Sequence, residues 1–242
     1  MPAASPAAPI AAHPPGALAT LQCEVAACAL CPRLREYGDR IARERRRAFA
    51  NETYWGRPVP AFGDPQARLL IVGLAPAAHG AHRTGRMFTG DRSGDFLYAA
   101  LYRAGFASAP VSRHRDDGLR LHSAYLTAAA RCAPPGNKPL PEEFARCRPY
   151  LARELELLPR LQVILSLGKL AHDQVLLVLQ QKLGFPRRSA YPFAHGAEYR
   201  IGAFRLLASY HPSQQNTFTG RLTAAMLDEV LARAAGRGRW AL

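Results

Sequence analysis

Residues 69–96 read LLIVGLAPAAHGAHRTGRMFTGDRSGDF, a pattern that predicts a strand, a long loop and a helix in that order. The four apolar residues 69–72 are typical of a buried parallel strand. The helix should begin with Ser93 as its cap and Asp95 in its first turn, with Phe96, Leu97, Ala100 and Leu101 on one face. Open α/β folds bind ligands at the carboxyl ends of their strands, so we expect the small-residue loop 73–80 to form the floor of a ligand pocket.

The rest of the chain continues this alternation. Further strands are expected at Ser123–Ala128, Gln162–Leu167 and Phe204–Ser209, and helices at Glu142–Leu158, Lys169–Gln180 and Arg221–Ala235, the last ending at Gly236. The pattern predicts an α/β fold with a four-stranded, mainly parallel sheet covered on both faces. Residues 53–64 read as an irregular segment broken by Gly and Pro. We interpret residues 1–20, rich in Ala and Pro, as a disordered leader and residues 21–242 as a single domain.

The net charge of +14, from 32 basic and 18 acidic residues, favours a polyanionic partner, with nucleic acid as the first choice. The composition leaves an alternative open, because only three of the basic residues are lysines and an Arg-, Ala- and Pro-rich chain can simply reflect a GC-rich genome. The Arg-rich segment 40–49 is either a solvated helix or a phosphate-contacting face. No apolar run approaches the length of a membrane span, and no secretory signal is recognisable, so we expect a cytoplasmic protein without a membrane partner.

Five cysteines are present, and a reducing compartment favours metal binding over disulfides. Cys28 and Cys31 form a Cys-x2-Cys pair, and Cys132 and Cys147 form a second pair about a hundred residues later. Four thiolates suit structural zinc or an iron–sulfur cluster, and the spacing does not choose between them. They could also be unlinked buried cysteines. Cys23 is interpreted as a bystander.

Three segments carry a resemblance to a known family: GLAPAAHG…RTGRMFTGD, RCAPPGNKPLPEEFARC and SYHPSQQNTFTGRLT. Together they resemble the family 5 (type b) uracil-DNA glycosylases, over about residues 28–235. The resemblance implies a three-layer α/β/α sandwich around the four-stranded sheet. It also implies a structural 4Fe–4S cluster on Cys28, Cys31, Cys132 and Cys147, and hydrolysis of the bond between uracil N1 and the deoxyribose of a flipped-out nucleotide. The loop floor would then receive a nucleobase.

The resemblance assigns the main catalytic role to His211, in the His-Pro-Ser turn after the fourth strand. Its neutral imidazole would donate a hydrogen bond to O2 of the departing base. Phe88 matches the aromatic residue that stacks on that base. Asp91 and His79 are candidate polar helpers, and Asp91 can equally cap a turn. His82 stands where we expected Asn or Asp.

Further base-binding positions lie in the loop and at a strand end. They are Gly73, Leu74, Ala75, Ala77 and Ala128. Leu74 and Ala75 replace the acidic residues that position water in other branches, so catalysis would depend on stabilising the leaving group. Ala128 replaces a uracil-reading Asn, and Ala77 a bulky aromatic that excludes thymine. We therefore hypothesise a looser pocket that also accepts hypoxanthine.

The loop 213–221 (SQQNTFTGR) is predicted to enter the base stack while the target base is flipped out. Its candidate DNA-binding residues are Ser213, Gln214, Gln215, Asn216, Thr217 and Arg221, although an ordinary surface loop has the same composition. The expected partner of this monomer is double-stranded DNA containing deaminated bases, with single-stranded DNA as a second form. Two alternatives remain: a family 4 or DNA-crosslinking relative, and a non-catalytic metal-binding DNA module.

Overall fold

A six-stranded sheet in the order β1-β3-β2-β4-β6-β5 forms the centre of the protein. The structure, a computed structural model, describes residues 16–236. The four central strands are parallel, and they are β3 (Ala124–Ala128), β2 (Leu69–Gly73), β4 (Val163–Leu167) and β6 (Phe204–Ser209). Two antiparallel edge strands, β1 (Phe62–Gly63) and β5 (Glu198–Ile201), were not predicted. Their signal is weak, because β1 has two residues and β5 lacks the continuous apolar run of a buried strand.

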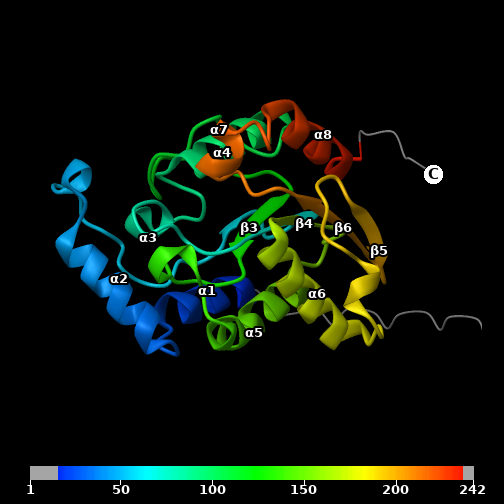
Figure 1. The fold of residues 1–242 in the computed structure, drawn as a ribbon, viewed down its shortest axis with the longest axis horizontal. Helices are drawn as coiled ribbons and strands as arrows, with labels where there is room; N and C mark the ends of the chain where they lie inside the picture. The colour runs from blue at the N-terminus through cyan, green and yellow to red at the C-terminus, as the bar shows by residue number, and fades with distance from the viewer. Residues whose placement is uncertain (1–15, 237–242) are drawn as a thin grey trace, which may run out of the picture.

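Helices cover both faces of the sheet, so the α/β/α sandwich is confirmed (Figure 1). One layer contains α4 (Arg92–Arg103) and α8 (Ala224–Ala234), and the other contains α1 (Ala17–Ala27), α5 (Pro141–Leu157) and α6 (Lys169–Leu183). Strand β2 serves both layers, because successive side chains of a strand point to opposite faces. Leu69 and Ile71 pack in the core with α4 and α8, whereas Leu70 and Val72 pack with α5 and α6.

The predicted helices are present with small shifts, and local chemistry explains them. Thr223 caps α8 by accepting the Met226 N–H at 3.3 Å, so that helix begins after residue 221. Gly184, with φ of +71°, ends α6 at Leu183. Asp91, not Ser93, caps α4, because its Oδ1 accepts the Gly94 N–H at 3.0 Å. Ser93 lies inside the first turn.

The predicted leader was too long at its end, because α1 begins at Ala17; residues 1–15 lie outside the described residues. Leu21 and Val25 are buried, which anchors α1. Helix α2 (Pro32–Glu44) and the short helix η1 (Arg47–Phe49) contain most of the Arg-rich segment 40–49, most of whose residues are exposed. Within residues 16–236 no single helix combines the length and the apolar composition of a membrane span. Helices α1 and α2 meet both criteria only when they are taken together, and the pair is bent by 79°.

Besides η1, four short helices of residues 16–236 lie in the connections: α3 (Ala81–Thr84), η2 (Pro135–Asn137), η3 (Arg188–Ala190) and α7 (Gln214–Phe218). Three of them, α3, η2 and α7, follow the carboxyl ends of β2, β3 and β6. The parallel strands therefore bring segments that are far apart in sequence to one edge of the sheet.

Candidate active site

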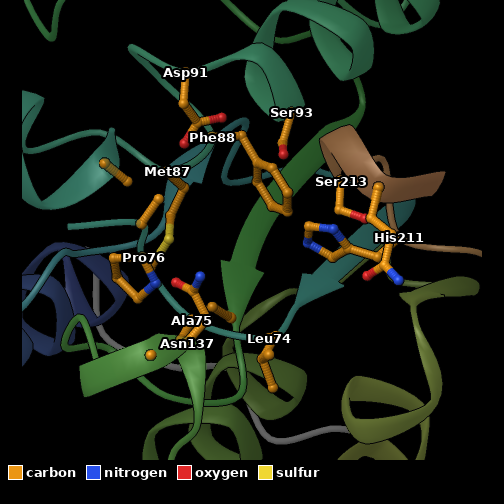
Figure 2. Close-up of a pocket in the computed structure, with 15 residues that line it drawn as sticks. Leu74, Ala75, Pro76, Met87, Phe88, Asp91, Ser93, Asn137, His211 and Ser213 are labelled. Carbon is orange, nitrogen blue, oxygen red and sulfur yellow. The ribbon is translucent and has the colours of Figure 1, made fainter. Parts of the chain in front are cut away.

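A cavity of about 460 Å³ opens at the carboxyl ends of β2 and β3. It lies on the loop 73–80, as the sequence predicts, and is shown in Figure 2. Its walls include Leu74, Ala75, Pro76, Ala77, Met87, Phe88, Asp91, Ser93, Ala128, Asn137, His211, Ser213 and Gln215. Apolar walls with a few polar groups are typical of a site for a flat, partly polar ligand.

Phe88 is held in a backbone conformation that its neighbours must accommodate. Its φ is +53°, an uncommon value for a residue with a bulky side chain. A Cβ on Gly73 would lie 2.5 Å from Phe88 Cζ, and a Cβ on Gly94 would collide with the Phe88 carbonyl oxygen. The hydroxyl of buried Tyr98 donates to the Met87 carbonyl oxygen at 2.9 Å. These contacts fix the phenyl ring against the cavity.

Arg86 fixes the segment before Phe88 through hydrogen bonds to Asp117 and Ser112. Its buried guanidinium donates to both carboxylate oxygens of Asp117, at 2.8 and 2.5 Å, and to Ser112 Oγ at 2.6 Å. A bidentate arrangement restricts the arginine to one orientation. The segment preceding Phe88 is therefore rigidly attached to the body of the protein.

His211 faces Phe88 across the cavity. Their ring centroids lie 6.1 Å apart with 30° between the ring planes (Figure 2). Burial lowers the pKa of His211 to about 4, so the imidazole is neutral near pH 7. The side chain of Asn216 donates to the His211 carbonyl oxygen at 2.8 Å. Within residues 16–236 no hydrogen bond engages a ring nitrogen of His211, which leaves an N–H available to a ligand.

Asp91 combines a capping role with a position in the cavity wall. One oxygen accepts the Gly94 N–H, and the other comes so close to Gly80 that a Cβ there would collide with it. Burial raises the pKa of Asp91, while the N–H groups of Gly94 and Ser93 act in the opposite direction. The carboxyl group can accept a further hydrogen bond from a ligand or water.

The two histidines of the loop lie outside the cavity wall. His79 Nδ1 is 3.0 Å from the Tyr54 hydroxyl, and His79 lines a neighbouring groove instead. His82 is buried, and its Nε2 lies 3.0 Å from the Gly38 carbonyl oxygen. His82 therefore connects α3 to α2. The predicted base contact of His79 stays a prediction.

The remaining predicted base-binding residues lie at or beneath the cavity. Leu74, Ala75, Ala77 and Ala128 line it, and Gly73 lies beneath Phe88. Asn137, which was not predicted as a site residue, brings a side-chain amide into the cavity from η2 (Figure 2). Its φ of +57° fits the turn Pro134-Pro135-Gly136-Asn137, a turn signal directly downstream of β3 that could have identified it.

The predicted DNA-contacting residues belong to α7 and its flanks. Ser213 and Gln215 line the cavity and Gln214 the neighbouring groove, whereas the Thr217 hydroxyl donates to the Ser213 carbonyl oxygen at 3.2 Å. Arg221 lies over the Tyr210 ring at 4.6 Å. Phe218, at the end of α7, is 68% exposed. Contact of these residues with DNA stays a prediction.

The four cysteines of the predicted metal centre share one region. Cys31, Cys132 and Cys147 are buried and Cys28 is half-buried, and all four are free thiols. Burial, and then the nearby thiols of Cys147, Cys28 and Cys31, raise the pKa of the Cys132 thiol. Within residues 16–236, however, no three His, Cys, Asp or Glu side chains come together closely enough to hold a single metal ion. The metal assignment stays a prediction, and Cys23 is exposed on α1.

Comparison with known proteins gives a consistent result. The sequence pattern of the Uracil DNA glycosylase superfamily matches residues 60–235. The chain is 54% identical over 209 residues to the type-5 uracil-DNA glycosylase of Thermus thermophilus, covering 86% of this chain and 92% of that protein. It is 52% identical over 221 residues to the type-5 enzyme of Mycobacterium bovis, covering 90% and 81%. Identity to the type-4 enzyme of Archaeoglobus fulgidus is 29% over 160 residues, covering 64% and 70%.

Proposed function

This chain belongs to the type-5 uracil-DNA glycosylases, within the uracil-DNA glycosylase superfamily, and we propose that the Phe88–His211 cavity binds the flipped-out base and stabilises its departure. The protein is a glycosidase that removes uracil from DNA in repair. The observation that carries the proposed mechanism is the pairing of a fixed aromatic ring with a neutral imidazole across one cavity. As the N-glycosidic bond breaks, negative charge develops on the base and positive charge on the sugar.

The separation of the two rings determines how the base lies. A base sandwiched between Phe88 and His211 would need about 7 Å, two van der Waals contacts, and the centroids are 6.1 Å apart. The base therefore stacks on Phe88 and meets His211 at its edge. At that edge the neutral imidazole donates to O2, where charge accumulates in the transition state. Loss of such a donor slows catalysis by about 10²–10³-fold.

The Asn137 side chain supplies a second amide to the cavity (Figure 2). An amide can donate and accept at once, which suits the edge of a base that carries both carbonyl oxygens and N–H groups. We assign Asn137 to base binding. Asn137→Ala should therefore weaken uracil excision, while Asn137→Asp, which lacks the donors, should not restore it.

Asp91 is proposed to hold the attacking water, and its capping role must be separated from that function. Asp91→Ala would remove the cap and cost about 0.5–2 kcal/mol of stability. Asp91→Asn keeps a residue that caps equally well but loses the carboxylate. If Asp91 positions water, Asp91→Asn should retain the unfolding midpoint and lose excision rate. An unchanged rate would reduce Asp91 to a cap.

The pocket walls support a wider substrate range than uracil. Ala75, Ala77 and Ala128 project only methyl groups, so no bulky side chain at these positions excludes a purine. We propose hypoxanthine as a second substrate. Single-turnover release from inosine-containing and uracil-containing duplexes tests this, with Ala77→Phe as the narrowing variant. Ala77→Phe should reduce hypoxanthine release more than uracil release, and no release of hypoxanthine by the native protein would refute the proposal.

A 4Fe–4S cluster on Cys28, Cys31, Cys132 and Cys147 is proposed as a structural cofactor that links segments distant in sequence. The donor set fits, because three of the four thiols are buried and the Arg131 N–H donates to Cys147 Sγ at 3.4 Å. Four thiolates also suit structural zinc, so the proposal of a cluster over zinc rests on the resemblance to the family and needs a direct test. Iron and sulfide analysis, with absorption near ~400 nm, tests the cluster; a colourless zinc protein would refute it.

The decisive test of the whole function compares native protein with His211→Ala on a uracil-containing duplex under single-turnover conditions. We expect release of free uracil by the native protein and a rate about 10²–10³-fold lower in the variant. Full activity in His211→Ala would remove the histidine from the mechanism. DNA binding without release of base by the native protein would instead support a non-catalytic module.

A further inference from the structure

A second hollow of about 700 Å³ adjoins the base cavity. We call it the basic groove, lined among others by Arg46, Phe49, Arg83, Arg92, Arg113 and Gln214. It extends from the end of α2 to the start of α4 and passes beside α3. Ala77, Asp91, Gly136 and Asn137 line both hollows, so the groove opens directly into the cavity.

The rim of the basic groove carries three arginines that form no ion pair within residues 16–236. Arg46, Arg92 and Arg113 are exposed, and none of the three forms an ion pair within that range. The acidic residues of the groove are Asp91, which is half-buried, and Asp95, which is exposed. The Arg92 guanidinium lies 5.2 Å from the centroid of the Phe218 ring, and its N–H groups have no ion-pair partner among the described residues. Exposed guanidinium groups around a hollow are suited to bidentate contacts with phosphate.

The floor of the groove is rigid by contrast. Arg83 is buried and ion-paired with Glu52, and its guanidinium lies 3.8 Å from the centroid of the Phe49 ring. It also donates to the carbonyl oxygens of His79 at 2.8 Å and Gly90 at 3.0 Å. Arg83 thus holds the groove open, while the three rim arginines remain available to a ligand.

We infer that the basic groove binds the phosphodiester backbone of the DNA strand that carries the flipped-out nucleotide, on one side of the damaged position. The inference rests on the proposed function, because it takes the cavity to hold the base. We choose this strand over its complement because the groove is continuous with the cavity. The sugar of the extruded nucleotide lies at the cavity mouth, and the chain leaving that sugar on one side enters the groove across the residues shared by the two hollows.

The test removes the rim charges and measures binding as a function of salt. Arg46→Gln, Arg92→Gln and Arg113→Gln are combined in one variant. The control variant combines Arg160→Gln, Arg187→Gln and Arg188→Gln, which are exposed, form no ion pair within residues 16–236, and lie away from the groove. The probes are single-stranded oligonucleotides with 2′-fluoro-deoxyuridine, since fluorine disfavours the sugar cation and prevents excision. The nucleotide is placed near the 5′ end in one probe and near the 3′ end in the other.

The expected result is selective for one probe. For that probe, the slope of log Kd against log salt should fall by about 0.7 for each lost phosphate contact, about 2 in the triple variant. The other probe and the control variant should retain the native slope. An unchanged slope for both probes would overturn the inference. Equal losses for both probes would also overturn it, because they would indicate general electrostatic attraction.

Excision separates this inference from the function on which it rests. At DNA concentrations that saturate the triple variant, it should release uracil at the native single-turnover rate, because the rim arginines do not line the base cavity. If the native protein releases no uracil, the proposed function fails. If it does and the slope is unchanged, only the inference about the groove fails.

Discussion

Replacing Gly73 with alanine tests how closely the stacking residue is seated. The added methyl carbon would lie 2.5 Å from Phe88 Cζ and 3.0 Å from Phe88 Cε2, whereas carbon atoms in contact prefer about 3.5–4.0 Å. The ring must therefore move by about 1 Å. It cannot retreat along its backbone, because the Phe88 carbonyl oxygen fits against Gly94 at a point where even a Cβ would collide.

We expect Gly73→Ala to cost about 1–3 kcal/mol of unfolding free energy, the usual range for overpacking. A displacement of about 1 Å at the stacking surface should slow uracil excision by about 10²-fold. Urea denaturation and single-turnover excision measure the two effects. The control is the double-mutant cycle with Phe88→Ala, in which the methyl group meets no ring and its cost should be close to zero. If Gly73→Ala costs the same stability with and without the phenyl ring, the reasoning is wrong.

Three further predictions concern the interior. Glu154→Gln should cost about 3–5 kcal/mol in urea denaturation, because it leaves the fully buried Arg131 guanidinium without its carboxylate. Glu24→Gln, at an exposed ion pair, should change the free energy of unfolding far less. The pKa of His211 is about 4 in the folded protein and about 6.5 in the unfolded chain, so its contribution to stability is complete above pH 6.5 and is lost as the pH falls toward 4. The excision rate should therefore not change between pH 8 and pH 6. A rate that halves near pH 6.5 would contradict a neutral donor. Cys132→Ser should abolish absorption near ~400 nm and lower the unfolding midpoint, and retained colour would remove this thiol from the proposed cluster.

The central strands were predictable because both faces of the sheet are covered. A strand such as Leu69–Gly73 then reads as a continuous apolar run, which few other structures produce. The edge strands lack this signal, since Phe62–Gly63 is two residues long and Glu198–Ile201 is partly exposed. The helix cap at Asp91 was missed for another reason: Asp and Ser are equally good caps, and only the backbone path decides between them.

The site was predictable where one residue occupies a recognisable motif, and unpredictable where residues meet only in space. His211 and Phe88 come from motifs more than a hundred residues apart, and both line the cavity. Asn137 lies in a turn whose sequence indicates a bend but says nothing of what the bend faces. The placement of His79 in the groove likewise depends on Tyr54, which holds its ring from a segment that looks irregular in sequence.

The stretch from Ala128 to Cys132 connects the cavity wall to a cysteine by a short, hydrogen-bonded segment. Only three residues lie between Ala128 in the cavity wall and Cys132, and an extended chain spans at most about 14 Å over these four steps. Ala129 and Ala130 donate to the carbonyl oxygens of Gly73 and Leu74, so the stretch is fastened alongside the loop floor. We expect oxidation of the Cys132 thiol, by air or peroxide, to displace Ala128 in the wall of the proposed base cavity. An ageing preparation should lose its discrimination between bases before it loses its fold.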